Sequence, residues 1–154
     1  MPALVVAVAC GGGTSPPVAN RSGQPAVAEA PDRDGFVELL KTHADHSLAA
    51  GSENGCPADE TIGVWTGRLL DNGMPKDDGG RHELTGGCGR YDARKMPYLD
   101  PASPADEETH WYCRLDAYAS DPAGESPWSC GLFVRVRKVD RAVDWDSLVC
   151  PGTC

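Results

Sequence analysis

The chain has 154 residues, which suits one domain with a short extension rather than several domains. Its formal net charge is −9, and its basic residues are scattered along the chain. Nucleic acid and anionic membrane surfaces are therefore poor candidate partners, because binding to phosphate groups requires clustered lysine and arginine. The 18 glycines and 13 prolines predict many turns and few long helices.

The first segment of the chain is apolar and ends at a cysteine. Residues 3–9 read Ala-Leu-Val-Val-Ala-Val-Ala, and Cys10 follows directly. Small apolar residues immediately before a cysteine resemble the lipobox of bacterial lipoproteins. This resemblance implies cleavage before Cys10, a lipid on its thiol, and a place in the cell envelope, anchored to a bacterial membrane on the periplasmic side or at the cell surface. It covers only this N-terminal stretch and implies nothing about the remaining residues.

The same segment leaves the mode of export open. Ala7-Val8-Ala9 equally fits the small-x-small pattern of ordinary secretory cleavage. No lysine or arginine precedes the apolar run, so we expect the true start to lie upstream of Met1. Both interpretations cut before Cys10 and export the chain, and the alternative is a cytosolic chain with an apolar start. The run is much shorter than the roughly 20 residues that span a bilayer.

Three regions are expected along the chain. Residues 1–9 are a remnant of the signal peptide. Residues 10–33 are rich in glycine, serine, proline and alanine without hydrophobic periodicity, and we expect a flexible tether carrying the lipid. Residues 34–154 form a single disulfide-bonded α+β domain.

The first element of this domain is a predicted helix over residues 35–49. Asp34 is its expected N-cap, and Gly51 is its expected C-terminal stop. Four apolar residues fall on one stripe of the helix and would face the core. They are Val37, Leu40, Ala44 and Leu48.

Strands are predicted to follow the helix. Residues 111–117 and 130–137 alternate apolar with polar side chains, and a turn-rich segment joins them as a hairpin. Further strands are expected at residues 62–70, 81–85, 91–99 and 142–149, with a glycine-rich corner at residues 86–89. The sequence thus predicts an α+β fold, in which one N-terminal helix packs on an antiparallel sheet of about five or six strands.

The cysteines indicate an oxidising compartment. If Cys10 carries lipid, six of the 7 cysteines remain for disulfides. They are Cys56, Cys88, Cys113, Cys130, Cys150 and Cys154. Aligning the apolar faces of the hairpin places Cys113 opposite Cys130, which predicts that pair. Cys150–Cys154 would close a tight loop, and Cys56–Cys88 would take the two that remain. Two disulfides, a metal site or free thiols are the alternatives.

Several polar groups are candidates for chemistry. His43 and His46 would share a helix face and could bind a metal, but no third ligand is indicated. The acidic segment at residues 71–79 lacks the ligand order of an EF-hand. Carboxylates at Asp106, Glu107, Glu108, Asp116 and Asp144 could form an acid–base pair, and Tyr98, Tyr118 and Trp128 could form an aromatic patch. No catalytic residue, metal ligand or cofactor is assigned from the sequence.

The expected function is that of an exported envelope lipoprotein with a non-enzymatic binding or scaffolding domain. Its expected partners are the membrane, through the lipid anchor, and an envelope protein or polysaccharide. One alternative is a metal-dependent or acid/base hydrolase of the envelope. Another is a pilin- or pseudopilin-like head, because such heads also place one helix before an antiparallel sheet.

Overall fold

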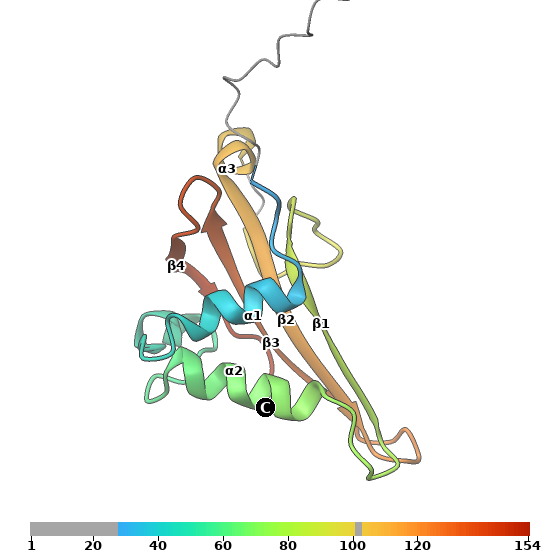
Figure 1. Ribbon diagram of the computed structural model, residues 1–154. Coiled ribbons are helices and arrows are strands. Elements are labelled where there is room, and N and C mark those ends of the chain that lie inside the picture. Colours follow the sequence, from blue (N-terminus) through green and yellow to red (C-terminus); the bar gives the residue numbers. More distant parts are fainter. Residues whose placement is uncertain (1–27, 101–102) are drawn as a thin grey trace, which may run out of the picture.

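The computed structural model describes residues 28–100 and 103–154, so Cys10, the signal-peptide remnant and most of the expected tether lie outside the described residues. Helices α1 (Arg33–Lys41) and α2 (Ile62–Gly73) lie across one face of a four-stranded antiparallel sheet (Figure 1). The strands are β1 (Arg81–Gly89), β2 (His110–Ser120), β3 (Trp128–Arg137) and β4 (Val143–Val149), in the order β1-β2-β3-β4. Two short helices complete the fold, η1 (Ala49–Asn54) and α3 (Pro104–Thr109). The α+β class is confirmed, whereas the predicted five or six strands and single helix are wrong.

Helix α1 is shorter than predicted. The Asp32 side chain, rather than Asp34, caps it by accepting a hydrogen bond of 2.8 Å from the Gly35 amide. The helix ends at Lys41 because consecutive tight turns follow, including one closed by the His46 amide on the His43 carbonyl at 2.9 Å. Leu48, the last residue of the predicted stripe, is still fully buried although it lies beyond the helix.

Helix α2 occupies a segment for which the sequence predicted a strand. Thr61 caps the helix through its side chain, and the helix runs to Gly73. Ile62, Trp65 and Leu69 are buried at intervals of three and four residues, which is the period of a helix and not of a strand. Trp65, the aromatic residue of the predicted strand, therefore belongs to the core-facing stripe of α2.

The predicted hairpin is confirmed as β2 and β3, but its register is not. Cys113 pairs with Val134, and Cys130 pairs with Ala117. The true register differs from the predicted one by four residues, an even number, so the same side chains still face the core. Alternation in the sequence determines which side chains of a strand face the core. It does not distinguish between registers that differ by an even number of residues.

Three other predicted strands have mixed outcomes. Residues 81–85 are confirmed within β1, and the strand predicted at residues 142–149 is confirmed as β4, which begins one residue later. The expected glycine-rich corner at residues 86–89 is wrong, because these residues continue β1 against β2. Residues 91–99 form turns rather than a strand.

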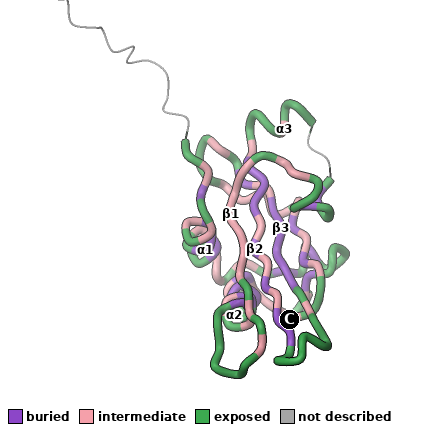
Figure 2. Tube along the Cα trace, turned by 90° about the vertical axis from the view of Figure 1, so that its right-hand side faces the viewer, coloured by how far each residue is buried: buried purple, intermediate pink, exposed green. Residues whose placement is uncertain are grey.

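The core has two parts, one on each face of the sheet. The helices cover the larger part, where Phe36, Leu40 and Trp65 pack against the inward side chains of β2 and β3. On the opposite face, the turns after β1 place Met96 and Leu99 against Tyr112 and Phe133. Burial is concentrated along β2 and β3, the central strands of the sheet (Figure 2). Among the described helices, none has the length and apolar character needed to cross a bilayer.

Three disulfides join all six cysteines of the domain, as the even count predicts. The bonds are Cys56–Cys150, Cys88–Cys113 and Cys130–Cys154. Each of the three predicted pairings is therefore wrong. The register explains the first error, because Cys113 lies opposite Cys88 on β1 rather than opposite Cys130 on β3.

Candidate functional site

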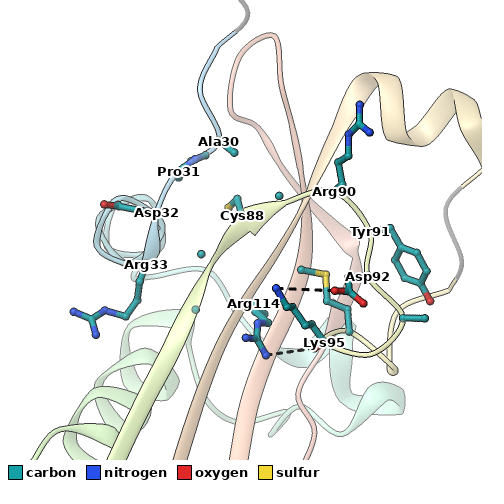
Figure 3. A pocket seen from close by; sticks show the side chains of 15 residues that line it. Ala30, Pro31, Asp32, Arg33, Cys88, Arg90, Tyr91, Asp92, Lys95 and Arg114 are labelled. Atoms are coloured by element: carbon teal, nitrogen blue, oxygen red, sulfur yellow. Dashed lines mark hydrogen bonds and ion pairs between the residues drawn. The ribbon is translucent and has the colours of Figure 1, made fainter.

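A groove of about 870 Å³ opens where β1 ends (Figure 3). We call it the β1 groove. Its walls come from four places: the segment before α1, the last residues of β1, the turns that follow β1, and β2. The residues concerned are 30–33, 86–93, Lys95, Met96 and Arg114.

Glycines at the end of β1 allow the N-terminal segment to approach the strand closely. The Cys88 amide donates a hydrogen bond of 2.8 Å to the Pro31 carbonyl, and Asp32 forms a bridge with Gly87. A Cβ on Gly87 would lie 3.2 Å from the Arg33 amide nitrogen. Ala30 also packs against the core, so packing reaches into the predicted tether. Without side chains on these glycines, the floor of the groove stays open.

Alanine at Gly87 is expected to lower the free energy of unfolding by at least about 1 kcal/mol. Its φ of +124° is a conformation that a side chain strains, and the added Cβ would press on the N-terminal segment. Gly89→Ala is the matched control, since nothing lies within 4 Å of a Cβ there. Urea unfolding of both variants checks the expectation, and an equal loss in the two would contradict it.

The β1 groove gathers positive charge in a chain whose net charge is −9. Four cations line it: Arg33, Arg90, Lys95 and Arg114. Two carboxylates, Asp32 and Asp92, also line it, so positive groups exceed negative ones by four to two; Asp32 caps α1, and Asp92 lies 4.0 Å from the Lys95 ammonium.

Arg114 is the least exposed of the four cations. Its Nη1 donates to the Asp116 carboxylate at 3.0 Å and to the Lys95 carbonyl at 3.5 Å. Figure 3 shows the Arg114 and Lys95 side chains close together beside the turns after β1. A guanidinium held in this way can present its remaining N–H groups to an anionic group without further ordering.

A second, smaller hollow of about 310 Å³ lies on the same sheet face. Arg81, Glu83, Thr85, Asp116 and Tyr118 line it. Burial raises the pKa of Asp116 to about 6, and the Arg114 guanidinium opposes this shift. Asp116 is one of the carboxylates that the sequence suggested for acid–base chemistry; it lines this second hollow and pairs with Arg114, which lines the β1 groove.

The raised pKa of Asp116 predicts a loss of stability as the pH rises. The folded chain binds this proton more tightly than the unfolded chain, whose carboxyl titrates near 3.8. The contribution of Asp116 is therefore most favourable below about pH 4 and declines as the pH rises to about 6. Asp116→Asn removes this titrating group and keeps an oxygen that can accept from Arg114. The free energy of unfolding of the variant, relative to that of the wild type, should therefore rise by about 1 kcal/mol from pH 4 to pH 6. Urea unfolding at pH 4, 5, 6 and 7 measures the gain, and a constant difference would contradict the shifted pKa.

The other suggested carboxylates lie elsewhere, and two of them have partners. Asp106 accepts a hydrogen bond of 2.8 Å from the Ser103 hydroxyl at the start of α3, and Asp144 pairs with Arg135 at 2.7 Å. Glu107 and Glu108 lie on α3. The suggested aromatic residues are also dispersed: Tyr98 packs on Phe133, Tyr118 lies under Arg81, and Trp128 packs against the larger core. They do not form one patch.

The two histidines suggested for metal binding contact a tryptophan instead. The His46 ring stacks on Trp145 with 3.9 Å between centroids, and His43 meets the same ring edge-on at 5.4 Å. Burial lowers the pKa of His46, and the nearby His43 adds to the effect. Within residues 28–100 and 103–154, no three histidine, cysteine or acidic side chains are placed to hold a metal ion.

His82 and the acidic segment at residues 71–79 form a local clamp. The His82 ring contacts the Asn72 carbonyl at 2.9 Å through Nδ1 and the Asp78 carboxylate at 2.8 Å through Nε2. Both hydrogen bonds raise the pKa of His82, and the bond to Asn72 has the larger effect. Hydrogen bonds from the Gly80 amide and then from His82 lower the pKa of Asp78. The clamp joins the end of α2 to the start of β1, away from the β1 groove.

Sequence reasoning did not find the β1 groove. The one available signal was the cluster of glycines at residues 86–89, since glycines inside a strand often mark a close approach of another backbone. Comparisons with protein-family models, with curated proteins and with solved structures found no match to this chain. The β1 groove therefore carries the functional argument.

Proposed function

We propose that this chain is an exported domain, held to the cell envelope by lipid on Cys10, that binds an acidic polysaccharide in the β1 groove. The observation that carries the proposal is the gathering of four cations around a glycine floor in an acidic chain. The three disulfides are consistent with an exported protein.

The lining of the groove favours a carbohydrate over a protein partner. Protein interfaces usually have an apolar core with aromatic anchors. Here the lining is mainly charged side chains and glycine backbone, with Tyr91 and Met96 as its larger uncharged members. Carboxylate groups along a sugar chain would pair with the arginines, and the sugar rings would lie over the open glycine floor.

Calorimetric titration with a tetragalacturonate tests the proposal. Reversing two groove cations, in the double variant Arg90→Glu with Lys95→Glu, should weaken binding at least tenfold, and added salt should weaken wild-type binding. The matched control reverses Lys41 and Lys76, two partly exposed cations outside the groove. Absence of binding, or an equal loss in both double variants, would contradict the proposal. A glutamate tetrapeptide that binds as tightly would contradict the carbohydrate part.

Asp116 supports one second candidate, an acid/base hydrolase. A carboxyl whose pKa lies near 6, in a hollow beside a basic groove, is suited to transfer protons at neutral pH. Release of reducing ends from the oligosaccharide by the wild type, but not by Asp116→Asn, would favour this candidate. A pilin-like head is less well supported, because two helices rather than one cover the sheet.

A further inference from the structure

The β1 groove shares one of its cations with a carboxylate that lies outside the groove. Arg114 lines the groove, and its Nη1 donates a hydrogen bond of 3.0 Å to the Asp116 carboxylate. Asp116 itself lines the second, smaller hollow. Both residues belong to β2, two positions apart, so their side chains lie on the same face of the sheet. An anionic ligand in the groove would therefore compete with Asp116 for the charge of Arg114.

The neighbouring strands crowd Asp116 from both sides. Its register partner on β3 is Gly131, where an added Cβ would lie 2.7 Å from Asp116 Oδ1. Its register partner on β1 is Thr85. The carboxylate therefore lies close against the sheet, and its side chain is 28% exposed. This burial raises the pKa of Asp116 to about 6 in spite of the guanidinium beside it, which places its titration between mildly acidic and neutral pH.

The charged or titratable side chains around Asp116 lie on β1 and β2. They are Arg81, Glu83, Arg114 and Tyr118. Arg81 pairs with Glu83 at 2.9 Å and lies over the Tyr118 ring. On β3, the residues of this sheet face are uncharged: Ser129, Gly131 and Phe133. Titration of Asp116 therefore acts on the groove through its ion pair with Arg114.

The charge state of Asp116 changes the net charge that the groove offers to a ligand. Four cations and two carboxylates line the groove, which is a net charge of +2. Pairing of Arg114 with an ionised Asp116 halves this charge to +1. Protonation of Asp116 restores the full charge without movement of any other group, and a ligand that carries several carboxylates gains from the difference.

We propose that Asp116 regulates the β1 groove, so that the groove binds its acidic ligand more tightly in mildly acidic surroundings than at neutral pH. This inference rests on the proposed function, because it concerns the same groove and the same class of ligand. The coupling is reciprocal: if protonation of Asp116 favours the ligand, the bound ligand favours protonation of Asp116 to the same extent. The carboxyl should therefore titrate at a higher pH in the complex than in the free domain.

Calorimetric titration with tetragalacturonate at pH 5 and at pH 7.5 tests the regulation. The wild type should bind about fivefold more tightly at pH 5. The carboxylates of the ligand are ionised at both values, since ordinary carboxyl groups titrate near about pH 4. A carbon-detected NMR titration of the wild-type Asp116 carboxyl, with and without the ligand, gives a measurement that needs no variant. Its midpoint should rise when the ligand is bound.

Asp116→Asn keeps the shape of the side chain and cannot titrate. At pH 7.5 this variant should bind about as tightly as the wild type does at pH 5, and its affinity should change less than about twofold between the two values. The variant retains all 4 histidines, which also titrate in this range, so the comparison isolates Asp116. Glu83→Gln is the matched control, because it removes a carboxylate from the same hollow and leaves Asp116 in place. It should keep the pH dependence of the wild type.

The outcomes separate the regulation from the proposed function. Absence of binding at both pH values would overturn the proposed function and this inference together. Binding of equal strength at both values, or a wild-type midpoint that the ligand leaves unchanged, would overturn the regulation alone. A pH dependence that persists in Asp116→Asn, or that Glu83→Gln abolishes as fully, would show that other charges control the groove and would also overturn it.

Discussion

Alanine at both Cys56 and Cys150 is expected to lower the free energy of unfolding by about 4 to 5 kcal/mol. This disulfide closes a loop with a sequence separation of 94, so it restricts the unfolded chain strongly. Both cysteines are buried, and the Cys150 amide donates to the Asn54 carbonyl at 3.0 Å. The bond therefore holds the segment after η1 against the end of β4, an edge strand whose pairing with β3 is irregular.

The matched control for this bond is the pair Cys130 and Cys154. Its separation is 24, so the same chain-entropy relation gives a smaller loss, about 3 to 3.5 kcal/mol. Guanidinium unfolding without reductant measures both double variants. A loss for Cys130–Cys154 as large as that for Cys56–Cys150 would contradict the expectation. Peptide mapping without reduction should recover the Cys56–Cys150 cross-link, and recovery of Cys113–Cys130 would contradict the fold itself.

Alanine at Trp65 is expected to cost about 3 to 5 kcal/mol. The side chain is 3% exposed, and its indole Nε1 donates to the Gly131 carbonyl at 3.1 Å inside the core. Truncation leaves a cavity between α2 and β3 and removes the partner of a buried carbonyl.

Val64→Ala is the control on the same helix. Val64 is 49% exposed, so its loss should change stability by less than about 0.5 kcal/mol. Chemical unfolding of both variants provides the comparison.

Thr66 distinguishes the helix from the strand predicted at residues 62–70. In a strand with Trp65 facing the core, alternation would bury Gly63 and expose Val64 and Thr66. Thr66 is buried, so Thr66→Asp should be strongly destabilising, and a mild effect would contradict the helix.

Local sequence patterns predicted part of this fold. They failed where the structure depends on contacts between residues far apart in the sequence. Alternation in β2 and β3 correctly identified which side chains face the core, because one buried face requires it. It did not determine the register, and the Cys113 partner was wrong for that reason. The parity of the cysteines predicted three disulfides, but their connectivity depends on how β1 and the C-terminal residues pack, which spacing does not encode.

The same holds for the candidate sites: the sequence indicated individual residues but not what surrounds them in the fold. Asp116 was a candidate from the sequence, but its pKa depends on burial under the fold and on Arg114. His43 and His46 were suggested as neighbours on a helix face, and they are neighbours around Trp145, a residue far along the chain. The β1 groove combines four separate segments, so no short motif could have revealed it.

The most direct test of the proposed function is a ¹⁵N–¹H correlation titration of the domain with tetragalacturonate. The account predicts saturable shifts of amides in residues 86–92 and at Arg114, with little change on α1 and α2 beyond the first turn of α1. The same titration of the Arg90→Glu, Lys95→Glu variant should require at least tenfold more ligand. Shifts confined to the helices or to the β3–β4 side, or no shifts at all, would contradict binding in the β1 groove.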